Sequence, residues 1–460
     1  MWFKNRISQF FASTPTWVIA LVFFLFSLTI HLAVSWERCT KASANNHFAY
    51  QAQVWLKGRL DLPKAPPHGN DWALVTTLSL KDGRTLRGSF WHSRGNTAFR
   101  TTHGTFVTVR SDQILRRKRQ WYVSFPPMPA ILMVPFVAIW GTHFNDVIFT
   151  IVFASANGVL LWLLLLALGR RGFHKRTRAE ALSLSLLFLF GSVHFFSAVR
   201  GEVWFTAHIL GVFFALLYLL SLFDHRFFMA GLALGAAALC RTPFVFAALL
   251  VPFVTYRKEK VLFSMRTLKP LLRFGIPFAF LLILAMIHNW ARFDNPFEFG
   301  HYYLNIRWRG RMERYGLFSL EYLSRNLSVA LTLLPRLKTT APFIQISPHG
   351  MALWLTTPIF FALIRFRGKH PLAIPMAVVI LPMALMALLY QNSGFVQFGY
   401  RFSIDYSPLL ILLLAFSHLR FGRLYYALLG YSVAINLFGA ITFARHRQYY
   451  PPGSFLFFMS

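Results

Sequence analysis

Two carboxylates in this sequence have the surroundings of a catalytic acid or base. The chain contains only 15 Asp and Glu among 460 residues, so each can be considered in turn. Glu202 follows Arg200 in a tight turn between two apolar stretches, and Asp405 follows Tyr400 and Arg401 at the start of another. Ionisable side chains at membrane depth are costly and often functional. We therefore take Glu202 and Asp405 as catalytic candidates, and Arg200, Tyr400 and Arg401 as candidate substrate ligands.

The same residues also have a structural interpretation, and the sequence leaves it open. Arg200 and Glu202 would then form an ion pair that marks the end of a membrane span. Arg401 and Asp405 stand four residues apart. That spacing lets opposite charges pair on one face of a helix.

Arginines are interleaved with aromatic residues between residues 291 and 347. The planar guanidinium group binds two oxygens of a phosphate at once. Arg292 and Arg307 are therefore candidates for holding the phosphate of a substrate. The alternative for this region is general attraction to lipid headgroups, with the aromatic side chains forming an interfacial belt.

The composition excludes a soluble fold for these residues. Hydrophobic residues make up 56% of the chain and charged residues 13%, whereas soluble domains carry about 25% charged residues. The formal net charge is +32. Most of the cations lie in short loops between apolar runs, where they set membrane topology. The charge therefore does not indicate nucleic-acid binding.

Placing the basic loops in the cytoplasm gives a consistent path through the cytoplasmic (inner) membrane. Lys4 and Arg6 precede the first apolar run, which puts the N-terminus inside. The predicted fold is an all-α polytopic membrane protein with about 11 transmembrane helices. The expected spans are residues 16–35, 146–168, 180–199, 203–223, 227–241, 243–256, 272–290, 348–364, 371–390, 406–419 and 424–443. They divide the chain into residues 1–36, an outer loop 37–145, helices within 146–290, a second outer loop 291–347, and helices with an outer tail within 348–460.

The first outer loop is predicted to contain a small β-hairpin module at about residues 70–112. Its first turn contains Asp82-Gly83, which supplies the positive φ of a tight hairpin. We expect Asp71, Asp82 and Asp112 to be solvated at this module or its flanks. The basic run 116–119 follows the module and suits lipid headgroups or a phosphorylated substrate. The apolar stretch at about 127–140 is short for a span and is expected to be an interfacial helix.

Short motifs along the chain resemble those of one superfamily. They are the helix-like segment 46–62, Tyr122-Val-Ser-Phe-Pro126, Gly231-Leu-Ala-Leu-Gly235, Arg241-Thr-Pro243, Arg292-Phe-Asp-Asn-Pro296 and Gly399-Tyr-Arg401-Phe. In this order they resemble the GT-C superfamily of membrane glycosyltransferases. The likeness is greatest to bacterial enzymes related to protein mannosyltransferases and to the aminoarabinose transferase of lipid A.

The resemblance implies that an acidic pair just after the first span supplies the catalytic base. The matching place here holds Asn45-Asn46-His47. An amide cannot act as a base, so His47 or Glu37 would have to take this role. Asn46 would then lie near the substrate.

The resemblance also implies transfer of a hexose or pentose from a polyprenyl-phosphate donor to a lipid, glycan or protein acceptor at the outer face of the cytoplasmic membrane, within the cell envelope. The expected partners are this donor, a lipid or glycan acceptor and membrane lipids, without nucleic acid. A transporter or flippase of a lipid-linked glycan and a non-catalytic membrane assembly protein are the alternatives. No cofactor is expected, since the histidines lack metal-binding spacing. A divalent cation near the phosphate stays open.

Overall fold

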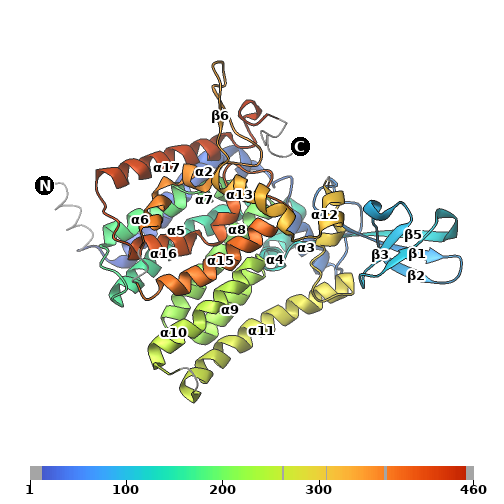
Figure 1. Ribbon diagram of the computed structural model, residues 1–460, viewed down its shortest axis with the longest axis horizontal. Coiled ribbons are helices and arrows are strands. Elements are labelled where there is room, and N and C mark those ends of the chain that lie inside the picture. Colours follow the sequence, from blue (N-terminus) through green and yellow to red (C-terminus); the bar gives the residue numbers. More distant parts are fainter. Residues whose placement is uncertain (1–12, 262–263, 307, 367–369, 452–460) are drawn as a thin grey trace.

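The helices of this chain form one body, and a small β-sheet projects from one side of it (Figure 1). This computed structural model describes residues 13–261, 264–306, 308–366 and 370–451. Lys4 and Arg6, which oriented the N-terminus in the sequence analysis, lie outside the described residues. Arg307, a predicted phosphate ligand, also lies outside them.

Five of the described helices are long and apolar enough to cross a membrane. Each coincides with a predicted span. They are α2 (Thr16–Ser35), α5 (Asp146–Arg170), α8 (Glu202–Phe223), α11 (Met265–Phe293) and α17 (Arg423–Thr442). Polar residues fix where some of them begin: the Asn145 side chain accepts hydrogen bonds from the backbone N–H groups of Val147 and Ile148, both 3.0 Å. Such a cap satisfies amides that have no partner within the helix.

Helical segments occupy the other six predicted spans, but they are shorter or interrupted. They are α6 and α7 (Arg178–Phe190, His194–Ala198), α9 (Phe227–Ala238), η5 and α10 (Thr242–Leu249, Leu250–Glu259), α14 and η8 (Leu353–Thr356, Pro358–Arg365), α15 (Ala373–Leu389) and α16 (Ser407–Phe416). Pro243 and Pro358 stand at the beginnings of the two 3₁₀ segments, where a residue without an N–H is tolerated. The helical class is confirmed, and the number of about 11 spans is not.

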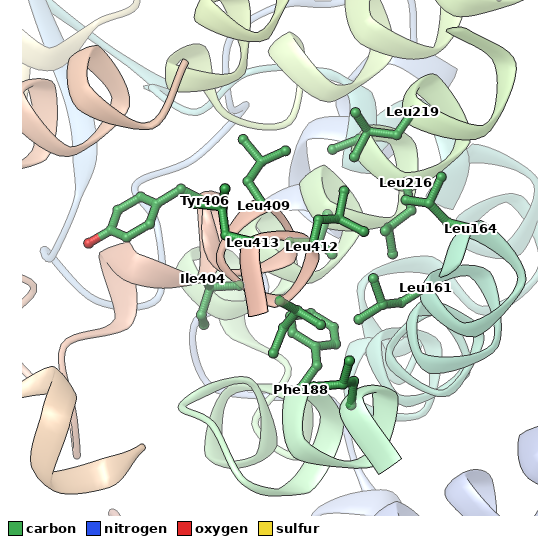
Figure 2. Packing of buried hydrophobic residues seen from close by; sticks show 14 of the residues in the cluster. Leu161, Leu164, Phe188, Leu216, Leu219, Ile404, Tyr406, Leu409, Leu412 and Leu413 are labelled. Atoms are coloured by element: carbon green, nitrogen blue, oxygen red, sulfur yellow. The ribbon is translucent and has the colours of Figure 1, made fainter. Parts of the chain in front are cut away.

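Helix α16 lies in the middle of the helical core. Figure 2 shows its Leu412 and Leu413 beside Leu161 of α5, Leu216 of α8 and Phe188 of α6. All five side chains are buried. Truncating a buried leucine of this kind to alanine costs about 2–5 kcal/mol.

Helices α9 and α11 pack closely because glycines face the contact. A Cβ atom on Gly231 would overlap the backbone oxygen of Phe274, and one on Gly235 would overlap the side chain of Leu281. Small residues four apart allow two helix backbones to approach. The Gly231-to-Gly235 motif thus positions α11. The C-terminal end of α11 lies next to the β-sheet (Figure 1).

The predicted β module is a five-stranded antiparallel sheet with strand order β4-β3-β2-β1-β5. The strands are β1 (Trp72–Leu80), β2 (Thr85–Phe90), β3 (Ala98–Thr101), β4 (Phe106–Thr108) and β5 (Ile114–Val123). Gly83 adopts the predicted positive φ in the first turn. The module extends beyond residue 112, and the basic run 116–119 belongs to its edge strand β5 instead of following the sheet. Charged side chains on an edge strand oppose pairing with other chains.

The two predicted outer loops pack against each other. Ala73 in β1 forms a bridge with Leu304, and the backbone N–H of Asn305 donates to the carbonyl of Trp72 over 2.9 Å. Arg87 in β2 forms an ion pair with Asp294 at 2.8 Å. The smaller elements of these loops are η1 (Trp36–Thr40), α3 (His47–Leu56), α4 (Met128–Trp140), α12 (Arg309–Tyr315), α13 (Leu323–Leu331), β6 (Arg336–Leu337) and β7 (Ile344–Gln345). Both loops therefore lie at the same end of the molecule.

Candidate functional site

A cavity of about 360 Å³ lies where the two loops meet the helical body. The first loop contributes Asp71 and Phe125, and the second contributes His301 and Phe318. The helical body contributes the start of α8, the residues after α9, the end of α15 and residues Arg401 and Phe402. The volume is that of a small-molecule site, and the lining is mostly apolar with a few charged groups, as in ligand pockets generally.

Asp71 is the carboxylate of this cavity, and its predicted solvation was wrong. It lies immediately before β1 with a φ of +59°, a conformation that aspartate tolerates better than most residues. The Trp204 indole Nε1 donates to Asp71 Oδ2 over 2.9 Å. Burial raises the pKa of Asp71 to about 6, although the Trp204 hydrogen bond and the charge of Arg401 oppose that rise. A carboxyl with such a pKa can exchange a proton near neutral pH.

Arg401 supplies a cation to the same cavity. It is only 5% exposed, and its guanidinium stacks against Phe205 and Phe402, with 5.2 and 5.6 Å from Cζ to the ring centroids. The guanidinium forms no hydrogen bond or ion pair with any described residue, and its Nε is buried without an acceptor. Buried charges are normally paired. An unpaired one beside a cavity points to an anionic ligand.

Asp405 pairs with Arg241 and His208 instead of with Arg401, which corrects the predicted pair. Arg241 Nε lies 2.8 and 2.9 Å from the two Asp405 oxygens, and His208 Nδ1 lies 2.7 Å from one of them. Residues Arg401–Asp405 form a 3₁₀ turn, in which residues i and i+4 do not share a face as they do in an α-helix. Asp405 is thus a buried partner that holds Arg241 at the cavity wall.

His47 stands beside Asp71 and does not line the cavity. Its ring stacks on Trp72 with centroids 4.0 Å apart, and its two nitrogens face the backbone oxygens of Asn45 and Asn70 at 3.1 and 3.3 Å. Burial lowers the pKa of His47 to about 4. With both nitrogens directed at carbonyl groups, His47 is suited to positioning the loop before Asp71.

Asn46 also holds the loop structure. Its Nδ2 donates to the carbonyls of Thr142 and Phe144 at 3.3 and 3.1 Å. These bonds join the start of α3 to the end of the α4 region. The Asn46 side chain is buried, and it is not part of the cavity lining.

Glu202, Arg200 and Glu37 do not line the cavity. Arg200 pairs with Glu202 at 2.6 Å, and Asn45 Nδ2 donates to the same carboxylate at 3.2 Å. Glu37 lies 3.4 Å from Arg445 on the surface. These contacts fit the structural interpretation of Glu202 as an ion pair at a helix end.

Arg292 and Tyr400 are buried and do not line the cavity. The Arg292 guanidinium donates to the backbone oxygen of Val123 and to Asn289 Oδ1, which fastens the end of β5 to α11. Tyr400 is 1% exposed and packs against Phe402. Of the predicted site residues within the described ranges, Arg401 alone lines the cavity.

Metal-binding groups do not gather in the described part of the chain: no three His, Cys, Asp or Glu side chains there stand together as metal ligands would. His301 at the cavity wall has its pKa lowered by burial to about 4, so its ring is neutral at pH 7. The charged groups of the cavity are therefore Asp71, Arg241 and Arg401.

Comparison with known protein families finds no family model that matches this chain. Comparison with curated proteins finds no match either. The cavity and its charged groups are therefore the features of this chain that point to a function.

Proposed function

We propose that this chain is a membrane glycosyltransferase that moves a sugar from a polyprenyl-phosphate donor to a lipid, glycan or protein acceptor. The observation that carries the proposal is a single cavity that presents a half-buried carboxylate, Asp71, together with an unpaired buried guanidinium, Arg401. Glycosyl transfer from a phosphate requires both a proton acceptor and a cation for the leaving phosphate.

Arg401 is suited to the donor phosphate. Its guanidinium is held in place by Phe205 and Phe402, so its free N–H groups are oriented before a ligand arrives. Arg241 adds a second cation at the wall, and only its Nε is used in the bond to Asp405. Charge-assisted hydrogen bonds in a partly desolvated site are stronger than those in water.

Asp71 is suited to the acceptor. Its carboxylate takes the proton of an acceptor hydroxyl while the hydroxyl oxygen forms a bond to the anomeric carbon of the sugar. The bond between that carbon and the phosphate oxygen breaks, and the electron pair leaves with polyprenyl phosphate. Arg401 stabilises the charge on this phosphate. Amide side chains of Gln391 and Asn392 at the wall are available for sugar hydroxyl groups.

We place the protein in the cytoplasmic membrane as a multi-pass protein with its N-terminus in the cytoplasm, an orientation that rests on the basic loops of the sequence. Five helices are long and apolar enough to span a bilayer. The cavity lies at the end where both long loops meet, which the basic loops assign to the outer face. A lipid-linked donor would keep its tail in the bilayer there and present its phosphate to Arg401.

The test is a transfer assay with the purified protein in liposomes. Radiolabelled mannosyl and aminoarabinosyl polyprenyl phosphates serve as donors, and a lipid extract of the host membranes supplies the acceptor. The proposal expects labelled product from the wild-type protein and none from Asp71→Asn. Binding or movement of the donor across the bilayer without any product would instead identify a transporter of lipid-linked sugars. Absence of both would favour an assembly protein.

A further inference from the structure

A second, smaller cavity of about 190 Å³ adjoins the first one. Gln391 and Asn392 line both, so a ligand could extend from one into the other. The remaining wall of the second cavity consists of Trp308, Arg311, Arg325, His349, Ser393 and Phe395. The proposed function does not use this space.

Two arginines face this cavity with unused donor groups. Arg325 is 8% exposed, and its Nε and one terminal nitrogen donate to Asn326 Oδ1 and to the carbonyl of Gln391 at 3.0 and 2.7 Å. Its other terminal nitrogen has no hydrogen bond within the described residues. Arg311 has an exposed side chain, and among the described residues only its backbone forms hydrogen bonds, with Trp308 and Tyr322.

Most of the neighbouring polar groups are also donors, and the exception is Gln391 Oε1, a buried acceptor that has no hydrogen bond among the described residues. Trp308 Nε1 is buried and has no acceptor among the described residues. Asn392 Oδ1 already accepts from the backbone N–H groups of Gly394 and Phe395, both at 2.9 Å, which leaves its NH₂ group for a ligand. No carboxylate belongs to the described lining.

The His349 side chain adds no positive charge to this cavity. Its Nδ1 lies 2.7 Å from Ser393 Oγ, and its Nε2 forms no hydrogen bond with the described residues. Burial, and after it the charge of Arg311, lowers the pKa of His349 to about 4. The ring is therefore neutral at pH 7, and the positive charge of the cavity comes from the two arginines.

We infer that the second cavity binds an oxyanion of the acceptor substrate, a phosphate or phosphodiester, and so holds the acceptor hydroxyl in the first cavity near Asp71. The arginine forks, the indole N–H and the Asn392 amide together match the several oxygens of a phosphate. The identification of this anion with the acceptor rests on the proposed function, whereas the binding of a phosphate does not. The anion is either the headgroup of a lipid or a phosphate carried by a soluble glycan, and both present the same oxygens.

The test measures phosphate binding to the full-length protein in nanodiscs. Glycerol phosphate is titrated into protein in phosphatidylcholine nanodiscs, and a parallel sample contains phosphatidylglycerol as the lipid probe. Arg311→Gln removes an exposed cation without internal partners, and Trp308→Phe removes one N–H while keeping an aromatic ring. Arg314→Gln is the matched control, because Arg314 lies on the same helix, is exposed and stacks on Tyr315 outside the cavity.

We expect Arg311→Gln to weaken the binding of one probe by roughly tenfold or more, and Trp308→Phe to weaken it less. Arg314→Gln should leave it unchanged. Binding of glycerol phosphate identifies a soluble source, and binding of phosphatidylglycerol alone identifies a lipid source. Equal losses in Arg311→Gln and Arg314→Gln, or no saturable binding of either probe, would overturn the inference.

Arg401→Gln separates this inference from the proposed function. It should abolish sugar transfer, whereas the loss of glycerol phosphate affinity caused by Arg311→Gln should be the same within about twofold in the Arg401→Gln background, since Arg401 lines only the first cavity. If Arg401→Gln and Asp71→Asn both leave transfer intact, the proposed function fails even when the second cavity binds phosphate. If transfer depends on both residues but Arg311→Gln does not change the binding of either phosphate probe, the proposed function stands and the inference about the second cavity is wrong.

Discussion

Trp204 donates its indole N–H to Asp71 across 2.9 Å, and this bond ties the first turn of α8 to the loop before β1. Asp71 consequently has a fixed orientation at the wall of the cavity that Arg241 and Arg401 also line. The bond also gives the carboxylate one donor, which partly offsets the cost of its burial.

The cavity should recognise the phosphate of a polyprenyl donor through Arg401. Farnesyl phosphate serves as a short probe, and farnesol is the matched ligand without the phosphate. We expect Arg401→Gln to lower the affinity for farnesyl phosphate by about 10- to 100-fold, because the substitution removes a charge-assisted hydrogen bond. Arg401→Lys should restore part of the affinity, since it keeps the charge and loses the fork. Titration calorimetry in detergent measures both. An equal loss of affinity for farnesol would show general damage to the site.

The rate of transfer should depend on the ionisation of Asp71. Its pKa is raised to about 6, and only the deprotonated form acts as a base. The rate is therefore expected to fall as the pH drops through about 6, and to be steady between about pH 7 and 8. A pH profile of single-turnover transfer measures this limb. A limb near pH 4, or none, would mean that another group accepts the proton.

The charge of Asp71 should cost stability. A folded-state pKa above the unfolded value means that the folded protein binds the proton more tightly, so stability is greatest at low pH and declines as the pH rises through about 6. Removing the charge by Asp71→Asn should therefore leave the Tm at pH 8 equal to or above that of the wild type. The corresponding gain in the free energy of unfolding is at most about 3 kcal/mol. Thermal unfolding in detergent at pH 5 and pH 8 measures the difference. A clear loss of Tm at pH 8 would show that the carboxylate holds the fold together.

Asp405 should behave in the opposite way. It is 4% exposed and pairs with Arg241 and His208. Asp405→Asn would leave the Arg241 charge without its partner, at a cost of about 3–5 kcal/mol. Yield and Tm in detergent should both fall. Glu37→Gln is the control, because the Glu37 carboxylate is exposed to solvent in its pair with Arg445, and such a pair is worth at most about 1 kcal/mol. Unchanged stability in Asp405→Asn would contradict a structural role.

Sequence patterns predicted the elements better than the site. Apolar runs located α2 and α5, and Asp82-Gly83 located the first hairpin turn, because hydrophobic periodicity and turn chemistry act over a few residues. The short strand β3 and the edge strand β5 were missed. Strand β5 carries four consecutive basic residues, which do not look like a strand until β1 pairs with it.

The site depends on contacts between distant segments, which one sequence does not show. In the sequence Asp71 looks like a turn residue beside a strand. Only its hydrogen bond with Trp204, which is 133 residues further along the chain, places it at the cavity. Arg401 was identified because of its type and position, whereas its expected partner was wrong because the 3₁₀ turn after Tyr400 alters the spacing of side chains. The only local pattern that could have indicated the position of Asp71 is an aspartate directly before Trp72, the aromatic residue that begins β1.

The most direct measurement is a comparison of donor binding and sugar transfer in Asp71→Asn and the wild-type protein at pH 7.5. The account predicts that Asp71→Asn binds farnesyl phosphate at least as tightly as the wild type, because a negative charge beside the phosphate is gone, while its rate of transfer falls by about 10²- to 10⁴-fold. Transfer at the wild-type rate, or a loss of binding that matches the loss of transfer, would contradict it.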